Sequence, residues 1–410
     1  MGAILIYAKA KRSKKMVLLL VVIYITFISL GLPDSLFGVA WPLVHLDFGL
    51  PESFGSLYSI IIAFSTGGVS FFAGPLIKKF GTGWVTAVSV ILTAIGLLGI
   101  SFAPNIYVMI ACAIVSGLGA GAIDTGLNNF VSLHYKAIHM NWLHCFWGVG
   151  VTVSPLIMSV FLKGGEWKMG YRAVSFIQFG IAIIVFISLF LWRKYDKREP
   201  ESAVYVQDEQ VKKEKISIKK MLLSPGVITG ILSLGFYCIV EFLMGTWGAS
   251  YLVNARGMDV DKAAQMVSIY YGGIMIGRFI SGIVSLKVND KNLIRGGASI
   301  LLLGVIMLAI PNEITIYIGM LLIGVGCGPI FPSTLHSVPL RHGAELSTYV
   351  TGYYMTGAYT IGFLTQVVFG YVATALSFEI MPYIMICIVG IMLVLVEVTN
   401  KKTAKEIVNG

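Results

Sequence analysis

Twelve long apolar runs divide this chain, and they restrict its fold more than any other feature of the sequence. About 20 apolar residues in a helix cross a hydrocarbon core of about 30 Å, and only helices or a closed barrel satisfy backbone polar groups in lipid. The residue alternation of barrel strands is absent. The sequence therefore predicts an all-α membrane protein with twelve transmembrane helices. The runs fall at about residues 17–43, 54–77, 84–103, 105–133, 142–162, 173–192, 222–253, 264–286, 293–311, 314–339, 346–376 and 380–399.

The distribution of basic residues predicts the orientation of these helices. The net charge of +10 is compatible with nucleic-acid binding, but 24 of the 30 Lys and Arg fall on one side when the N-terminus is assigned to the cytoplasm. This bias is the positive-inside rule of membrane proteins. We therefore expect a multi-pass protein of the cell membrane with both termini in the cytoplasm, and no nucleic-acid partner.

A highly charged segment separates two sets of six runs. Of the 28 residues in 193–220, 15 are charged, which is typical of a solvated linker. We expect an N-terminal six-helix bundle at 1–192, a cytoplasmic linker at 193–220 and a C-terminal six-helix bundle at 221–410.

The two sets are related by an internal repeat with an offset of 207 residues. Coincidence does not explain four matches at one offset. The matches are Gly117-x-Gly119-x-Gly121 with Gly324-x-Gly326-x-Gly328, Gly150 with Gly357, Asp34 with Glu241, and Gly38 with Gly245.

Six helices repeated in parallel resemble the plan of the major facilitator superfamily. The resemblance implies a major facilitator fold, in which two bundles enclose a central substrate site and rock to open it to each side in turn. It also implies that the glycines of helices 4, 5, 10 and 11 allow close helix packing. The superfamily signature between helices 2 and 3 is partly present at 74–81, but Lys78 replaces its usual aspartate. We therefore assign Lys78 to gating, with its interactions altered.

Charged side chains inside a membrane are costly and commonly functional. Asp34, Asp124 and Glu241 are the acids within apolar runs, and Arg278 is the basic residue deep in a run. A buried carboxylic acid can carry a proton when alternating access moves it between dry and wet surroundings. We expect Asp124 and Asp34 to couple transport to protons. Arg278 is assigned to gating, and it can instead pair with Glu241.

Polar and aromatic side chains share helix faces with these acids, at spacings of three, four and seven residues. A sugar needs hydrogen-bonding partners for its hydroxyls and a flat apolar surface for its C–H face. The same aromatic residues can instead serve helix packing. The predicted substrate-binding set is Asp34, Asn128, Asn141, His144, Trp147, Glu241, Trp247, Tyr359 and Gln366.

Helices 4 and 5 are similar to a narrower group, the fucose:proton symporter family. Residues 117–131 carry its Gly-x-Gly-x-Gly stretch, and Asp124 takes the position of the family's proton-coupling glutamate. Asp34 corresponds to the family's helix 1 aspartate, and residues 141–148 resemble its helix 5 stretch. His144 and Trp147 replace a glutamine and a sugar-binding asparagine, which argues against fucose. The family's bacterial glucose and mannose permeases are the preferred analogues.

These observations predict a proton-coupled hexose importer that works as a monomer among membrane lipids and needs no cofactor. Two alternatives remain open: an exporter of drugs or small metabolites, and a sodium-coupled sugar symporter. The five cysteines lie within apolar runs, and no pair has metal-ligand spacing. We expect no metal site and no enzymatic activity, because the short loops carry no nucleophile and base pair.

Overall fold

The computed structural model describes residues 14–135, 137–196, 222–342 and 344–409. Most of the predicted linker lies outside these residues. The described residues form fifteen α-helices and one short 3-10 helix. The helices are α1 (Lys14–Asp34), α2 (Leu36–Asp47), α3 (Phe54–Phe80), α4 (Thr82–Ser101), α5 (Ile106–His134), α6 (Ala137–Leu162), α7 (Trp167–Ile187), α8 (Leu189–Asp196), α10 (Val227–Arg256), α11 (Val260–Val284), α12 (Asp290–Ala309), α13 (Glu313–His336), α14 (Val338–His342), α15 (Ala344–Ala375), η1 (Phe378–Ile380) and α16 (Met381–Asn409).

The helices confirm the predicted all-α membrane fold. Eleven helical stretches among the described residues are long and apolar enough to cross a membrane, and α3 contributes a shorter apolar stretch at Phe54–Val69. The described part of the chain contains no β-strand. The protein is therefore a multi-pass membrane protein.

The first apolar run, expected as one helix over 17–43, is two helices, because α1 ends at Asp34 and α2 begins at Leu36. Pro33 lies near this break and has no backbone N–H to donate to the carbonyl of Ser29 one turn earlier. The side-chain amide of Gln178 donates to that carbonyl instead, at 2.7 Å. A buried polar residue of α7 thus satisfies the acceptor that the proline leaves open.

The same arrangement recurs in α6, where Pro155 lies inside the helix. Proline at this position leaves the carbonyl of Val151 without its helical donor. The Ser35 hydroxyl, at the break between α1 and α2, donates to this carbonyl at 3.0 Å. One serine therefore joins the kinked helix to the interrupted one.

Asparagine side chains cap the N-termini of several helices. Asn105 caps α5 through Val108 N at 3.1 Å, and Asn289 caps α12 through Asn292 N at 3.0 Å. Asparagine accepts from the backbone N–H groups that have no helical partner in a first turn. At the other end of α10, Gly257 adopts a left-handed conformation, with φ of 63°, and closes the helix.

The chain forms two compact units, which do not coincide with the predicted halves. Among the described residues, unit 1 comprises 14–33, 62–135, 137–150 and 172–196, and unit 2 comprises 34–61, 151–171, 222–342 and 344–409. Parts of the first six apolar runs therefore pack with the last six. The division into six-helix bundles at 1–192 and 221–410 stays a prediction.

In unit 1, polar contacts between helices sit in an apolar interior. The Ser29 hydroxyl donates to Gln178, and the Ser175 hydroxyl donates to the carbonyl of Ala94 at 3.0 Å. Close packing follows the glycines, since a Cβ at Gly121 of α5 would overlap the carbonyl of Thr66 in α3. The predicted role of this glycine in helix packing is confirmed.

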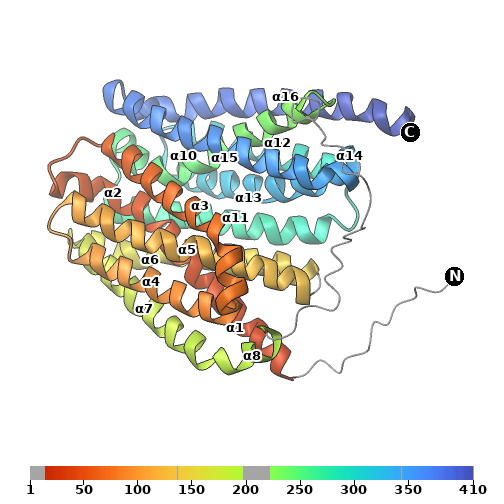
Figure 1. The fold of residues 1–410 in the computed structure, drawn as a ribbon. Helices are drawn as coiled ribbons and strands as arrows, with labels where there is room; N and C mark the ends of the chain where they lie inside the picture. Colours follow the sequence, from red (N-terminus) through yellow and green to blue (C-terminus); the bar gives the residue numbers. More distant parts are fainter. Residues whose placement is uncertain (1–13, 136, 197–221, 343, 410) are drawn as a thin grey trace. The chain divides into compact units, whose positions relative to one another are not determined.

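In unit 2, α10 is the central helix, and α15, α16 and α2 all pack against it (Figure 1). Tyr251 of α10 donates to the carbonyl of Leu308 in α12 at 2.8 Å. The hydroxyls of Thr399 in α16 and Thr229 in α10 lie 2.9 Å apart. We call the end of unit 2 where α10 begins the Val227 end, and the opposite end the Arg256 end.

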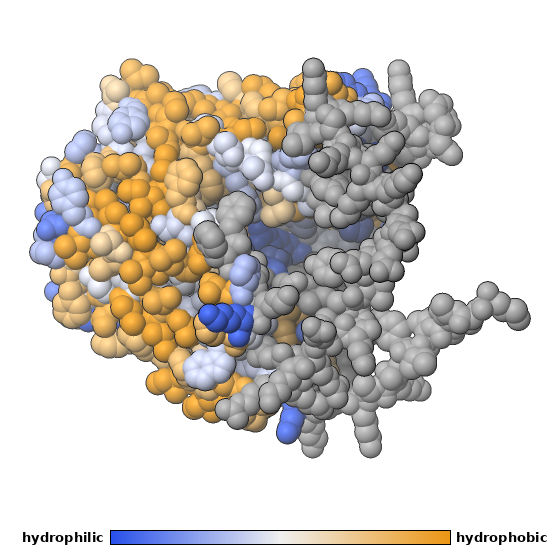
Figure 2. All heavy atoms as spheres, viewed as in Figure 1, coloured by the Kyte–Doolittle hydropathy of each residue, from blue (hydrophilic) through white to orange (hydrophobic). Residues whose placement is uncertain are grey.

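Large apolar side chains are exposed on many helices, as expected for surfaces that contact lipid. Figure 2 shows these hydrophobic residues, in orange, over much of the described surface on one face. Exposed apolar residues of the described helices include Phe176 and Ile183 of α7 and Phe279 and Ile283 of α11. The outward distribution of apolar side chains agrees with the membrane assignment.

Candidate functional site

Asp124 and Asn128 form a hydrogen-bonded pair on α5 in unit 1. The Asn128 side-chain amide donates to Asp124 Oδ1 at 2.8 Å and to the Asp124 backbone carbonyl at 3.0 Å. The side chain of Asp124 is exposed rather than packed in the protein interior, although it lies in a strongly apolar helix. Among the described residues, no cation lies within ion-pair distance of this carboxylate. The predicted proton-coupling acid therefore has a neutral partner.

The other predicted residues of unit 1 lie on α6 and α3. His144 is exposed, and its ring meets Phe27 edge to face with centroids 6.0 Å apart. Trp147 is half-buried one turn further along α6. Asn141 and Lys78 are helical, on α6 and α3, and their side chains lie outside the described part of the structure. The predicted roles of all four residues stay predictions.

Glu241 and Arg278 form an ion pair in unit 2. Arg278 Nη2 of α11 lies 3.6 Å from Glu241 Oε1 of α10, and their side chains are 17% and 16% exposed. The pairing was the structural alternative to separate roles in substrate binding and gating. The charge of Arg278 is therefore balanced within unit 2 by a carboxylate on the preceding helix, α10.

An aromatic cluster lies on α10, α13 and α15 of the same unit. The Tyr359 ring stacks on Phe242, with centroids 6.0 Å apart, and on Phe331, with centroids 6.2 Å apart. Tyr359 is 37% exposed, so part of this side chain is not covered by the rest of the protein. Tyr237 of α10 continues the cluster beside Phe331.

Two other predicted substrate-binding residues face the protein interior instead. Trp247 is 0% exposed, and its indole N–H donates to the carbonyl of Gln366 at 3.0 Å. The Gln366 side chain accepts from the Thr246 hydroxyl at 2.7 Å and is likewise buried. These contacts fasten α10 to α15, so neither side chain faces an open space in this conformation. Asp34, by contrast, is exposed at the end of α1.

Gly38 and Gly245, which the sequence repeat relates, contact each other in the structure. A Cβ built at Gly38 on α2 would overlap the carbonyl oxygen of Gly245 on α10. Each glycine lies one helical turn after its repeat-related acid, Asp34 or Glu241. The repeat therefore places equivalent positions of the first and seventh apolar runs against each other.

Further contacts that the sequence did not predict join residues 34–61 and 151–162 to the last six runs. The Glu52 carboxylate accepts from the Asn254 side-chain amide, with both oxygens 3.0 Å from Nδ2. The Ser56 hydroxyl donates to the carbonyl of Val367 at 3.2 Å, and the Ser268 hydroxyl donates to that of Thr152 at 2.6 Å. Glu52 and Asn254 are separated by 202 residues, and no sequence pattern links them.

The sequence model of the Major Facilitator Superfamily matches residues 23–367. The chain belongs to this superfamily. It is 25% identical to the glucose/mannose transporter GlcP of Bacillus subtilis over 318 residues, which cover 73% of this chain and 78% of GlcP. It is also 23% identical over 278 residues to the hexuronate transporter of the same organism, covering 64% of each chain.

Solved structures of other transporters share the fold. A mutant of the nucleoside transporter NupG superposes with a TM-score of 0.70 at 14% identity, covering 93% of this chain and 98% of NupG. The fucose:proton symporter FucP of E. coli has a TM-score of 0.59 at 16% identity, covering 93% of this chain and 98% of FucP. Both the predicted fold and the predicted membership of the Major Facilitator Superfamily are confirmed, and the superfamily consists of membrane transporters rather than enzymes.

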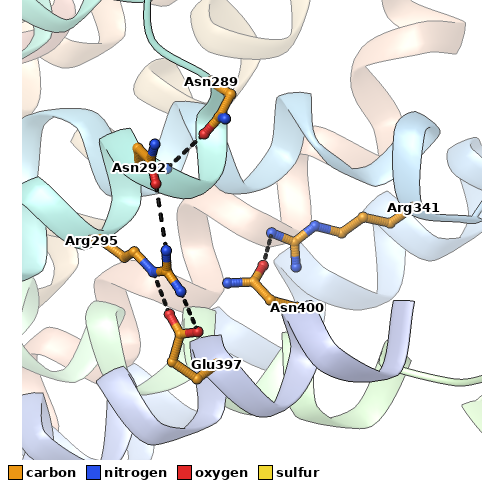
Figure 3. Close-up of polar contacts among 6 residues, drawn as sticks. All are labelled: Asn289, Asn292, Arg295, Arg341, Glu397 and Asn400. Atoms are coloured by element: carbon orange, nitrogen blue, oxygen red, sulfur yellow. Dashed lines mark hydrogen bonds and ion pairs between the residues drawn. The ribbon is translucent and has the colours of Figure 1, made fainter. Parts of the chain in front are cut away.

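Polar contacts cross-link helices at the Val227 end of this Major Facilitator Superfamily member. Arg295 of α12 donates to both carboxylate oxygens of Glu397 in α16, each at 2.5 Å (Figure 3). Arg341 of α14 donates to Asn400 of α16 at 3.0 Å. The bidentate pair is about two-fifths exposed on each side, in contrast to the pair of Glu241 and Arg278.

Proposed function

We propose that this transporter imports a glucose-like or mannose-like hexose by proton symport, with both termini in the cytoplasm. The observation that carries the proposal is the pair of Asp124 and Asn128 in unit 1. A carboxylate in an apolar helix, with an amide partner and no cation within reach among the described residues, loses its charge when it takes up a proton. We expect Asp124 to take up and release this proton once in each transport cycle, which would couple sugar movement to proton movement.

The second half of the chain favours a neutral substrate over an anionic one. Arg278 lies deep within the membrane helix α11, and Glu241 balances its charge at 3.6 Å. A carboxylate substrate would have to separate this pair to gain the guanidinium. A hexose needs only hydroxyl partners and an aromatic surface, such as the exposed part of Tyr359.

The kinship with GlcP supports the same substrate class, since that protein is a glucose/mannose transporter. The relationship to a hexuronate transporter makes a sugar acid the alternative that the test must distinguish. Asp34, Asn128, Asn141, His144 and Trp147 remain the proposed sugar-binding residues on the first six runs. On the last six, we retain Tyr359 and Glu241. Trp247 and Gln366 are retained only for conformations that expose them.

The test is uptake of labelled glucose, mannose and glucuronate into proteoliposomes of the purified full chain. We expect counterflow of one neutral hexose, and net uptake that rises when the outside is made acidic. A sodium gradient at constant pH is expected to have no effect. The variant Asp124→Asn should retain counterflow and lose the response to pH.

Matched variants make this test specific to Asp124. Asp47→Asn removes another acid, which binds Lys168 at 3.5 Å outside the proposed site, and should leave proton-driven uptake unchanged. Uptake of glucuronate but no neutral hexose would overturn the substrate assignment. Uptake driven by sodium alone would overturn the proton assignment, and expulsion of an amphiphilic cation under a proton gradient would favour an exporter.

A further inference from the structure

The Arg256 end of unit 2 is closed by contacts between early and late parts of the chain. Residues 34–61 and 151–162 belong to the first six apolar runs, yet they pack on α10, α11 and α15. The sequence offset of 207 relates α3 to α11 and α6 to α15. The contact of Ser56 with Val367 and that of Ser268 with Thr152 therefore join the two equivalent helix pairs.

The contact of Glu52 with Asn254 differs from these in two ways. It has no counterpart in the repeat, because Asp47 and Asp259, the equivalents of Asn254 and Glu52, bind lysines in their own halves instead. It also involves a charged group. Glu52 is 9% exposed and is the one acidic or basic residue among the buried residues that the structure describes.

The position of Glu52 is fixed from the side of the early chain. The indole N–H of Trp41, a fully buried residue of α2, donates to the Glu52 backbone carbonyl at 2.8 Å. Across the contact, Asn254 Nδ2 also donates to the carbonyl of Ser250 at 2.9 Å. One N–H of Asn254 thus serves its own helix, and the other serves the carboxylate.

This arrangement suits a contact that must break in every transport cycle. A carboxylate has about four acceptor positions, and a single amide N–H satisfies few of them. No cation of the described residues lies within ion-pair distance of Glu52. A buried carboxylate regains hydration when it is exposed. When the end opens, the hydration free energy of Glu52 therefore offsets part of the free energy lost with the hydrogen bond.

We propose that Glu52 and Asn254 form a latch that sets the balance between the closed and open states of the Arg256 end. They are positioning residues, and neither is assigned to the substrate. The inference rests on the transport activity proposed above, because it requires this end to open. It is independent of the identities of the sugar and the coupling ion.

The test measures opening directly through Ser268→Cys as a reporter. Ser268 is 3% exposed and lies in a separate contact, where its hydroxyl donates to Thr152. A thiol at this position reacts with a water-soluble maleimide only after the contact opens. The rate is measured on the purified full chain in detergent, and the parent with its five native cysteines provides the background to subtract.

We expect Glu52→Ala and Asn254→Ala each to raise the labelling rate at position 268 by about 10-fold. Glu52→Gln keeps an acceptor for Asn254 and should label within about 2-fold of the parent rate. Asn254→Asp alone should label faster than Asn254→Ala, because the new carboxylate would lie next to that of Glu52 and the two negative charges would repel each other. The swap Glu52→Gln with Asn254→Asp restores one amide and one carboxylate, and should return the rate to the parent value.

Asp259→Ala is the matched control, because it removes an exposed acid at the same end whose ion-pair partner among the described residues is Lys262. Its labelling rate should equal that of the parent. A parent-like rate in folded Glu52→Ala, or a swap that labels as fast as Asn254→Asp alone, overturns the latch. Failure of the sugar assay leaves these rates unchanged, so the two proposals fail separately.

Discussion

Asp124 in unit 1 and Glu241 in unit 2 present the same physical problem with different solutions. Each is an acid within an apolar helix. Asp124 is exposed and has the Asn128 amide 2.8 Å away, whereas Glu241 is mostly buried and has the Arg278 guanidinium 3.6 Å away. The first partner is neutral, and the second carries a full positive charge.

The difference separates a carboxylate that can change its charge from one that is fixed by its partner. Protonation of Asp124 leaves the neutral Asn128 able to hydrogen-bond. Protonation of Glu241 would leave Arg278 without its counter-charge in a largely buried place, which is costly. We therefore expect proton coupling at Asp124, and we expect the pair of Glu241 and Arg278 to contribute to stability. Four predictions test this contrast in order of effect.

The largest expected effect is on stability, at the second site. Arg278→Ala leaves Glu241 without its countercharge, and breaking such a pair costs about 3–5 kcal/mol of unfolding free energy. The melting temperature of the detergent-solubilised protein should fall markedly. Thermal unfolding followed by size-exclusion chromatography or tryptophan fluorescence measures the change.

A double variant separates pairing from the arginine itself. Arg278→Met combined with Glu241→Gln removes both charges and keeps the side-chain volumes similar, so most of the lost stability should return. An Arg278→Ala protein that melts with the parent would show that the pair contributes nothing to stability. The proposed difference between Asp124 and Glu241 would then not extend to protein stability.

The next effect concerns coupling at the first site. With the membrane potential clamped to zero, a gradient of one pH unit supports about 10-fold accumulation for one proton per sugar. Asp124→Asn should reduce accumulation to the external concentration, because the amide cannot carry the proton. Steady-state accumulation of labelled hexose in proteoliposomes gives this ratio, and Asp124→Glu should retain most of it. Full accumulation by Asp124→Asn would assign the proton to another group.

A smaller effect is expected for the partner of Asp124. Asn128→Ala removes the hydrogen bond to Asp124, which is worth about 1 kcal/mol, so we expect a modest loss of stability. Because Asn128 is also a proposed sugar-binding residue, we expect the half-saturating sugar concentration to rise about 5-fold. Counterflow kinetics measure the second quantity. Asn128→Gln retains the amide and is the matched control. An unchanged half-saturating concentration in Asn128→Ala would remove Asn128 from the sugar site.

The smallest effect is expected for the exposed pair at the Val227 end. Arg295 and Glu397 make two 2.5 Å hydrogen bonds, but both are partly solvated, and such pairs contribute about 0–1 kcal/mol. Arg295→Ala should shift the melting temperature far less than Arg278→Ala. Equal shifts for the two variants would mean that burial does not distinguish these ion pairs.

Much of the fold could be predicted because lipid allows a chain few choices. The apolar runs fix the helices, and the repeat identified Gly38 and Gly245 as equivalent positions, although their contact came only from the structure. The break near Pro33 was not predicted, and neither were the contacts that accompany it, in which Ser35 and Gln178 donate to carbonyls on other elements. Apolar periodicity contains no information about such long-range polar contacts.

The candidate site was predicted less completely, for the same reason. Intramembrane charge identified Asp124, Glu241 and Arg278 without any structure, because that cost is readable in one sequence. Trp247 was expected to face a substrate but packs on Phe369 and Phe378. Glu52 lies in a short loop beside Pro51, where acids are common and therefore uninformative. Only its partner 202 residues away distinguishes it.

The meeting of Gly38 with Gly245 has a consequence for the entropy of transport. A contact between two glycines freezes no side-chain rotamers, and Ser56 and Ser268 have short side chains that bond to helical carbonyls. Forming these three contacts therefore removes little conformational freedom from the chain. Long flexible side chains in their place would have to be ordered again on every turnover.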